Sequence, residues 1–435
     1  MARSFASIPV PSALPLVGHT LPYFFNTIDF VRRARDRYGD VVRFRVAGED
    51  SVVFFGPDAV EFVLVDREDN FSAGGGWGFR LGRFFRGGLL IRDGDDHRHS
   101  RRIMAGAFRP GPMKEYLTIL TRVMDQELDG WQDQKDFRFY PAFKQLSLQV
   151  AASCFLGITS TRETARVNAA FMDTVAATMA LIRYPLPGTA WHRGVRGRRY
   201  LEEYLTAMLP EKRRQESGDI FSRFCHATDE KGERFTDKEV VDHMIFLLMA
   251  AHDTITSSAS SLAWLLAQHT EWQDRLYQEL PEGELSLAGL SRMKAHEWCF
   301  HEALRLYPPL HTVPRRSLRD LEYAGYRIPA GTVVQTSIAT THRLDKFWQN
   351  PDAFEPERFA PPREENKQHP YLFTPFGAGP HICIGMGFAG MQIKAFLHSF
   401  LRRYRINTRP DRKFRVNFIP IPKPVDDLPL ILTRR

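Results

Sequence analysis

A hydrophobic pattern typical of α-helices runs almost without interruption from about residue 96 to residue 310. Its apolar residues recur at intervals of three and four, which gathers them on one face of a helix. The pattern predicts helices over residues 96–108, 114–132, 142–157, 163–183, 194–215, 237–268, 270–280 and 293–307. Because helices of this kind bury their apolar faces against one another, we expect a mainly α-helical protein with one large core.

Shorter segments on either side of this region predict a small β portion. The stretches VVRFRV and SVVFF form a hairpin pattern around AGED. Strand-like pieces return after residue 310, as LEYAGYRI, TVVQTSI, FRVNFI and LPLILT. Further helices are predicted at 28–38, 57–65 and 384–403, and residues 72–90 predict a glycine-rich aromatic loop of the kind that is often functional.

The chain shows no linker, low-complexity tract or internal repeat among its 435 residues. We therefore predict one domain over residues 1–435 rather than several. Its β-rich part is expected to comprise 1–60, 311–345 and 404–435, and its helical part 96–310 and 384–403.

One of the four cysteines stands in an unusual context. Cys154, Cys225 and Cys299 lie in helix-like apolar segments, where a small buried side chain is the expected role. Cys383 lies instead in FTPFGAGPHICIGMGFAG, where glycines allow tight turns and close approach to a flat ligand. A helix is predicted directly after it, and the positive end of a helix dipole favours a thiolate. Cys383 is therefore a candidate nucleophile or metal ligand.

The surroundings of Cys383 narrow the choice of chemistry. Zinc needs several Cys or His ligands at short spacing, and only His381 is close. An iron–sulfur cluster needs more cysteines nearby, and a cysteine hydrolase needs a base that the sequence does not place. One thiolate is enough for the axial ligand of a haem, where it donates electron density to the iron.

The same segment resembles the haem-binding loop of the cytochrome P450 family, which it matches at Phe376, Gly377, Gly379, His381, Cys383, Gly385 and Ala389. The resemblance implies a triangular helical prism that holds haem b (iron protoporphyrin IX) between a long central helix and the helix after the cysteine. It implies that Cys383 is the sulfur ligand of the iron, that His381 contacts a haem propionate, and that Phe376 lies on the thiolate side.

The predicted helix 237–268 is apolar on nearly every face, yet His252, Asp253 and Thr254 fall in its middle. A buried carboxylate is costly unless it is paired or functional. The resemblance implies that Asp253 and Thr254 are the acid–alcohol pair that relays protons to dioxygen. The chain departs from the family's usual pattern at Ala251 and Ile255, which leaves the route of the protons open.

Other motifs of the same family are present. His97 and Arg101 stand one helical turn apart, and Arg315 follows in PLHTVPRRS, where Arg316 is a weaker candidate. The resemblance implies that His97, Arg101 and Arg315 bind the haem propionates. It also implies a structural triad that fixes the core behind the haem and comprises Glu302, Arg305 and Arg358.

The resemblance implies a monooxygenase that inserts one oxygen atom of O2 into a lipophilic substrate such as a sterol, terpenoid, retinoid or fatty acid. The expected pocket residues are apolar: Trp77, Phe79, Phe84, Phe85, Phe246, Met249, Ala250, Val313, Phe418 and Ile419. Peroxide-using or rearranging haem-thiolate enzymes and non-catalytic haem or ligand-binding proteins remain alternatives.

The expected binding partners are inferred from the charge of the chain and from the motifs that it lacks. The net charge of +8 comes without basic runs interleaved with aromatics, which argues against nucleic acid as a partner. No flavin or nucleotide motif is apparent, so we expect electrons from a ferredoxin or flavodoxin with its reductase. A basic face after Cys383, with Lys394, Arg402, Arg403 and Arg405, suits an acidic donor. We expect a cytoplasmic monomer without a membrane span.

Overall fold

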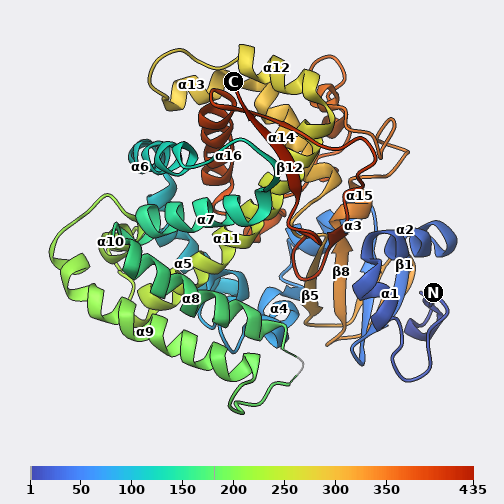
Figure 1. Ribbon diagram of the computed structural model, residues 1–435. Coiled ribbons are helices and arrows are strands. Elements are labelled where there is room, and N and C mark those ends of the chain that lie inside the picture. The colour runs from blue at the N-terminus through green and yellow to red at the C-terminus, as the bar shows by residue number, and fades with distance from the viewer. Residues whose placement is uncertain (1, 181) are drawn as a thin grey trace. The chain divides into compact units, whose positions relative to one another are not determined.

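The computed structural model describes residues 2–180 and 182–435 (Figure 1). These residues form two compact units, which are described separately. The β-rich unit comprises Met1–Phe79, His301–Cys383 and Val416–Lys423. The helical unit comprises Arg80–Phe300, Ile384–Arg415 and Pro424–Arg435.

A five-stranded sheet organises the β-rich unit. Its strand order is β1 (Val41–Val46), β2 (Glu49–Phe54), β8 (Val333–Ser337), β5 (Thr312–Ser317) and β3 (Phe71–Ser72). The predicted hairpin is confirmed, because β1 and β2 pair antiparallel from Val41↔Phe54 to Val46↔Glu49. The predicted strands near 321–328 and 332–338 are also found, as β6 (Leu321–Tyr323), β7 (Tyr326–Ile328) and β8.

Short helices pack around this sheet. α1 (Thr20–Phe25) precedes α2 (Thr27–Tyr38), which confirms the helix predicted at 28–38. The helix predicted at 57–65 is present as α3 (Pro57–Val60) and a π-helical turn over Glu61–Val65. α15 (Ile338–Thr341) follows β8 directly. The buried core of the unit includes Val52, Phe54 and Val334, whose side chains are completely covered.

Every long helix predicted between 96 and 310 is present, and all lie in the helical unit except the second half of the last one, which from His301 onward belongs to the β-rich unit. In chain order they are α5 (Gly94–Ala105), α6 (Pro110–Asp129), α7 (Phe139–Ala151), α8 (Thr161–Thr178), α9 (Ala190–Arg214), α11 (Asp237–Gln268), α12 (Thr270–Gln278) and α14 (Lys294–Leu306). The prediction extended α8 to 183 across Leu181, which lies outside the described residues. α16 (Met386–Leu401) confirms the helix after Cys383, and two short helices were not predicted, α10 (Ile220–His226) and α13 (Leu287–Arg292).

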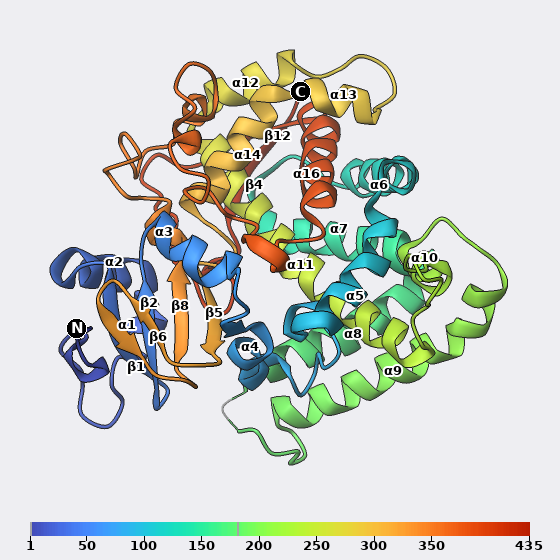
Figure 2. The same ribbon diagram turned by 180° about the vertical axis from the view of Figure 1, so that it is seen from behind.

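The longest helix, α11, is buried along most of its length and contacts α7, α9, α10 and α16 (Figure 2). Its start is fixed by a capping box, in which Thr236 and Glu239 each bind the other's backbone amide. Among the described residues, we find no helix that combines the length and the hydrophobicity of a bilayer-crossing segment.

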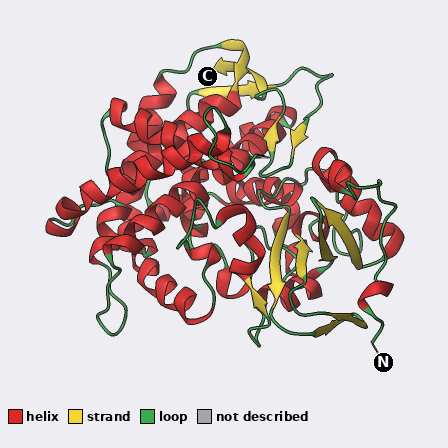
Figure 3. Cartoon of the chain, turned by 90° about the horizontal axis from the view of Figure 1, so that it is seen from below, coloured by secondary structure: helices red, strands yellow, loops and turns green. Residues whose placement is uncertain are grey.

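The C-terminal segment is divided between the two units, because Val416–Lys423 lies in the β-rich unit and the residues on either side of it lie in the helical unit. The prediction placed 404–435 with the β-rich part. In the structure β9 (Tyr404–Asn407) and β12 (Pro429–Arg434) join β4 (Gln134–Arg138) in the helical unit (Figure 3). The strand β4 was not predicted, because QKDFR carries too little apolar alternation to mark a strand. The chain also contains β10 (Val416–Asn417) and β11 (Lys423–Pro424).

The loop predicted at 72–90 is wrong over its first half, where the chain forms α4 (Ala73–Leu81). Ser72 Oγ accepts a hydrogen bond from the backbone amide of Gly75 at 2.7 Å, which caps this helix. A Cβ added at Gly76 would lie 2.7 Å from the carbonyl oxygen of Pro314 in β5. These glycines therefore serve close packing of a helix on a strand, not the flexibility of a loop.

Candidate active site

The loop before α16 presents Cys383 through a set of tight backbone turns. The amide of Cys383 donates to the carbonyl of Phe376 at 2.9 Å, and the amide of Ile382 donates to the carbonyl of Gly379 at 3.0 Å. The amide of Gly377 donates to Thr374 at 3.0 Å. Cys383 itself is exposed. The loop is thus closed by its own backbone, with Cys383 as an exposed residue at its end.

Two glycines make this loop conformation accessible. Gly377 and Gly379 have φ of +77° and +67°, a region that residues with a Cβ rarely adopt. A Cβ at Gly379 would lie 2.1 Å from the carbonyl oxygen of Leu64. The loop therefore rests directly on the backbone of the π-helical turn over Glu61–Val65. This contact helps to fix the position of the cysteine loop within the β-rich unit.

We expect Gly379→Ala to destabilise the protein by more than about 2 kcal/mol, because it adds a backbone clash to an unfavourable φ. Gly48→Ala is the matched control, since Gly48 has φ of +84° and no atom within 4 Å of an added Cβ. The control should cost about 1 kcal/mol, from the backbone conformation alone. Denaturant unfolding of both variants measures the difference. Equal losses would show that the contact with Leu64 has no importance for stability.

The other three cysteines cannot take the role of Cys383. All three are buried. Burial raises the pKa of the Cys154 thiol to about 12 and that of the Cys225 thiol to about 11. Both thiols therefore stay protonated at neutral pH and are inert. Cys383 is the one cysteine that offers a sulfur atom to a ligand.

The Glu302 carboxylate binds two buried arginines at once. Arg305 donates to it through Nε at 2.6 Å and through a terminal nitrogen at 2.8 Å, and Arg358 donates through Nε at 3.0 Å. All three side chains are completely buried. The two arginines also bind backbone carbonyl oxygens of the 342–353 segment, at His342, Gln349, Asn350, Pro351 and Ala353. This cluster therefore ties α14 to the irregular segment before the cysteine loop.

The cluster is larger than the three residues that the sequence predicted. Arg358 also donates to Glu365 at 2.6 Å. Arg363 donates to Glu365 at 3.0 Å and to Glu355 at 2.8 Å. The sequence motif located only the residues nearest to Glu302, because the others are brought in by the turns of the segment after PERF.

The structure distinguishes Arg315 from its neighbour Arg316. Arg315 is buried, and one of its terminal nitrogens donates to the carbonyl of Pro314 at 2.9 Å. Arg316 points the other way, donates to Gly331 at 2.7 Å and pairs with Glu49 at 2.8 Å. The alternation of β5 thus places the two side chains on opposite faces. Arg315 remains the predicted propionate ligand, and Arg316 is engaged elsewhere.

The remaining predicted haem contacts lie on two helices of the helical unit. His97 and Arg101 both stand on α5, where His97 is buried and Arg101 is half-buried. Gly385 is the N-cap residue of α16, and its carbonyl accepts the amide of Ala389 at 2.9 Å. The helix therefore starts at Met386, three residues after the cysteine and two residues later than the predicted start at 384.

Asp253 on α11 is held by two basic groups. Nδ1 of His252 lies 3.0 Å from its carboxylate, and Nζ of Lys144 on α7 lies 3.6 Å away. Burial opposes ionisation, but the hydrogen bond and charge of His252 and the charge of Lys144 outweigh it and lower the pKa of Asp253. The neighbouring hydroxyl of Thr254 donates to the carbonyl of Ala250 at 2.7 Å. Sequence reasoning did not find Lys144, which comes from a different helix.

We expect the interaction between Lys144 and Asp253 to contribute about 1 kcal/mol to the free energy of unfolding at pH 7, because both side chains are mostly buried. A double-mutant cycle with Lys144→Met and Asp253→Asn measures this coupling free energy. Since the folded-state pKa of Asp253 is lowered, the coupling is present above the unfolded pKa of about 3.9 and is lost as the pH falls through the folded value. A coupling free energy indistinguishable from zero at pH 7 would contradict this assignment.

The predicted pocket residues are divided between the units. Trp77, Phe79, Val313, Phe418 and Ile419 belong to the β-rich unit, and the others to the helical unit. Phe84 and Phe85 are 1% and 0% exposed, and Phe84 packs edge-on against Trp191 with ring centres 4.9 Å apart. The structure therefore places these two rings in the core of the helical unit. Phe246 is buried, and Met249 and Ala250 on α11 are half-buried.

A buried arginine that the sequence did not indicate fixes the segment around Phe84. Arg198 on α9 donates to the carbonyl of Phe84 at 2.8 Å and binds the carboxylates of Glu202 and Asp242. An added Cβ at Gly87 would meet Asp242 at 2.9 Å, so the chain passes directly over this pair. The acidic Asp242 inside an apolar helix was the one signal in the sequence that could have pointed to it.

Comparisons with known proteins extend these observations. A family model for cytochrome P450 matches residues 8–424. The chain is 38% identical to a putative cytochrome P450 136 of Mycobacterium tuberculosis, over 98% of this chain and 88% of the relative. It is 26% identical to a taxane 13-alpha-hydroxylase of Taxus cuspidata, over 100% and 94%.

The fold is also similar to that of a solved structure, a cyanobacterial cytochrome P450 with bound retinoic acid. The TM-score is 0.88 at 26% sequence identity, and the match covers 99% of this chain and 100% of the other. Together, the family model, the relatives and the fold agree with the motif around Cys383. The chain therefore belongs to the cytochrome P450 family of monooxygenases.

Proposed function

We propose that this monooxygenase binds haem b through the thiolate of Cys383 and hydroxylates a lipophilic substrate of the terpenoid or retinoid type. The observation that carries the ligand assignment is the state of the four cysteines: one is exposed at the end of a glycine-built loop, and three are buried. A lone accessible thiolate suits an axial haem ligand and no zinc or iron–sulfur site.

The residues present fit a haem. The cysteine loop packs at Gly379 on the backbone of Leu64 and Val65, which leaves no room for a side chain at that position. The proposed propionate ligands are Arg315 and His381 within the β-rich unit, and His97 and Arg101 within the helical unit. When bound, the haem supplies the activation of O2 that no amino-acid side chain can provide.

The proton supply is proposed to depend on Asp253 and Thr254. His252 and Lys144 hold the pKa of Asp253 below its usual range, so the carboxylate is ionised and readily gives up any proton that it takes on. The Thr254 hydroxyl donates its own hydrogen to Ala250 and therefore offers its oxygen lone pairs as an acceptor. We expect Thr254→Ala to divert electrons from product to peroxide. Product formation that stays fully coupled to electron consumption in this variant would reject the relay.

The substrate class rests on the relatives and on the character of the predicted pocket. Two plant relatives are named as a beta-amyrin 28-monooxygenase and a taxane 13-alpha-hydroxylase, and the similar solved structure holds retinoic acid. The half-buried Met249 and Ala250 and the buried Phe246 on α11 add apolar surface. Terpenoids and retinoids are therefore proposed ahead of sterols and fatty acids.

An electron donor of the ferredoxin or flavodoxin type, with its reductase, is proposed as the partner. The basic face that the sequence suggested for it is weaker than expected. Lys394 pairs with Glu297 at 2.8 Å and is 9% exposed, and Arg403 pairs with Asp125 and Asp129 at 3.0 and 2.9 Å. These cations are already neutralised within the helical unit, so the donor is not expected to depend on them.

A panel of terpenoids, retinoids, sterols and fatty acids, titrated into the purified protein, tests this function. Binding of a substrate beside the haem should shift its absorption spectrum, and the compounds that do so should be hydroxylated in the presence of a surrogate reductase, as measured by mass spectrometry. Spectral shifts or products confined to fatty acids would overturn the substrate class. Turnover that needs only peroxide and no reductase would overturn the monooxygenase mechanism.

A further inference from the structure

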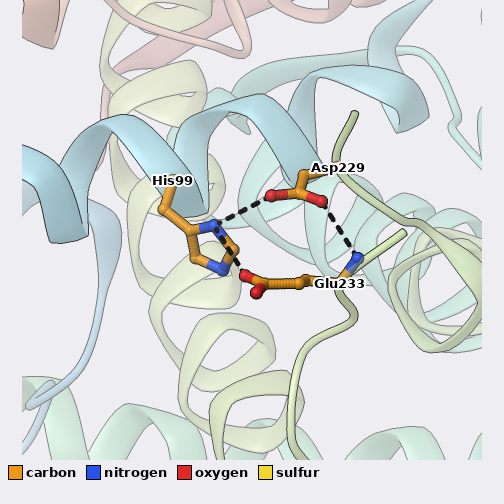
Figure 4. Close-up of side chains that lie close together, drawn as sticks. All are labelled: His99, Asp229 and Glu233. Carbon is orange, nitrogen blue, oxygen red and sulfur yellow. Dashed lines mark hydrogen bonds and ion pairs between the residues drawn. The ribbon is translucent and has the colours of Figure 1, made fainter. Parts of the chain in front are cut away.

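Three potential metal ligands meet on the outside of the helical unit, away from the cysteine loop in sequence. They are His99 on α5 and two carboxylates, Asp229 and Glu233, from the turn between α10 and α11. Their ligand atoms all lie within 4.8 Å of one another. Figure 4 shows the His99 ring projecting from its helix toward both carboxylates. We propose that these residues form a binding site for a divalent transition-metal ion.

The spacing of the three atoms suits an ion better than direct hydrogen bonds. Nδ1 of His99 lies 3.4 Å from Oδ2 of Asp229 and 4.0 Å from Oε2 of Glu233. Both distances exceed those of a good hydrogen bond from a charged donor, which are about 2.7–2.9 Å. Ligand atoms that each lie about 2.0–2.2 Å from a tetrahedral Zn²⁺ stand about 3.3–3.6 Å apart. A small movement of the Glu233 side chain would therefore complete the geometry.

The turn holds Asp229 ready for this role. Oδ1 accepts hydrogen bonds from the amides of Lys231 at 2.8 Å and Glu233 at 2.9 Å, so the other oxygen, Oδ2, is aimed at His99. The Asp229 side chain is only 3% exposed, which is unusual for a carboxylate on a turn. The turn itself is closed by the amide of Asp229 donating to Glu233 at 3.0 Å and by Gly232 at φ of +79°. Two of the three ligands thus belong to one rigid element.

The chemistry of the ligands selects the kind of ion. An imidazole nitrogen with two carboxylates suits Zn²⁺ and its first-row neighbours, whereas Mg²⁺ and Ca²⁺ prefer oxygen ligands alone. With three protein ligands, at least one position remains for water. A bound ion would join α5, which carries His97 and Arg101, to the turn that leads into α11. Its expected role is to hold these two helices together.

Zinc is the probe that tests the site. The full-length holoprotein, without an affinity tag, is stripped with chelator, incubated with Zn²⁺ in the presence of excess Mg²⁺, and desalted. We expect about one zinc per chain by elemental analysis, and a rise in unfolding temperature on the order of 1–3 °C. Hydrogen exchange over residues 228–234 should slow when zinc is bound.

Two variants and one matched control locate the ion. His99→Ala and Glu233→Gln should each lose the bound zinc, and Glu233 is exposed enough for its substitution to leave folding intact. His269→Ala is the control, because His269 stands 3.3 Å from the carboxylate of Glu271 but belongs to no group of three potential metal ligands found among the described residues. This variant should retain zinc. The proposal is overturned if the parent protein retains no zinc, or if Glu233→Gln and the control retain equal amounts.

Discussion

Glu302→Gln is expected to lower the free energy of unfolding by about 3–5 kcal/mol, because it leaves two buried arginines without their shared counter-charge. The amide keeps the shape of the side chain but replaces one acceptor oxygen by a donor, which faces the guanidinium group of Arg305 or Arg358. Since all three side chains are completely buried, water cannot compensate for the loss. Denaturant unfolding of the holoprotein, followed by tryptophan fluorescence, measures the change.

Glu49→Gln is the matched control in the same unit. Glu49 pairs with Arg316 at 2.8 Å, a distance similar to those in the buried cluster, but both side chains are more than a third exposed. An exposed pair contributes about 0–1 kcal/mol, so this variant should unfold close to the parent. If both variants lost similar amounts of unfolding free energy, burial would not explain the contribution of the Glu302 cluster to stability.

The long helices were predictable because their signal is carried by consecutive residues. The apolar residues of α11, for example, follow one another through the sequence from Asp237 to Gln268, and both ends of the helix agree with the prediction. α4 was missed for the opposite reason. Glycine disfavours helix by about 1 kcal/mol per residue relative to alanine. The gain that offsets this cost is packing against β5, which local sequence does not reveal.

The same distinction applies to the candidate site. The cysteine loop, the Glu302–Arg305 spacing and the acid on α11 were found because each is a short, contiguous motif. Lys144, Glu365 and Arg198 were not, since each reaches its partner from another element. Phe84 and Phe85 were assigned to the pocket because aromatic residues in a glycine-rich stretch suggest a binding loop, yet the fold turns both rings into the core. Tertiary packing decided these positions.

Cys383→Ser is expected to abolish monooxygenase turnover while leaving the fold intact. A serine hydroxyl stays protonated at neutral pH, so it cannot donate electron density to a haem iron as a thiolate does. Substitution of a residue that only contacts a metal ligand typically lowers activity about 10–100-fold. Loss of the ligand itself should therefore lower it by more than about 100-fold. The absorption band of the reduced, carbon-monoxide-bound protein should lose its thiolate form. Product analysis with a surrogate reductase gives the turnover.

Cys225→Ala is the control that separates the role of the thiolate from the general chemistry of cysteine. Its thiol is buried, and burial raises its pKa to about 11, so it is inert at neutral pH. This variant should keep the spectrum and the turnover of the parent, apart from a cost in stability for the small cavity. If Cys383→Ser retained the thiolate spectrum, another residue would have to supply the sulfur. If turnover also survived, the proposed role of the cysteine loop would be wrong, although the family membership of the chain would stand.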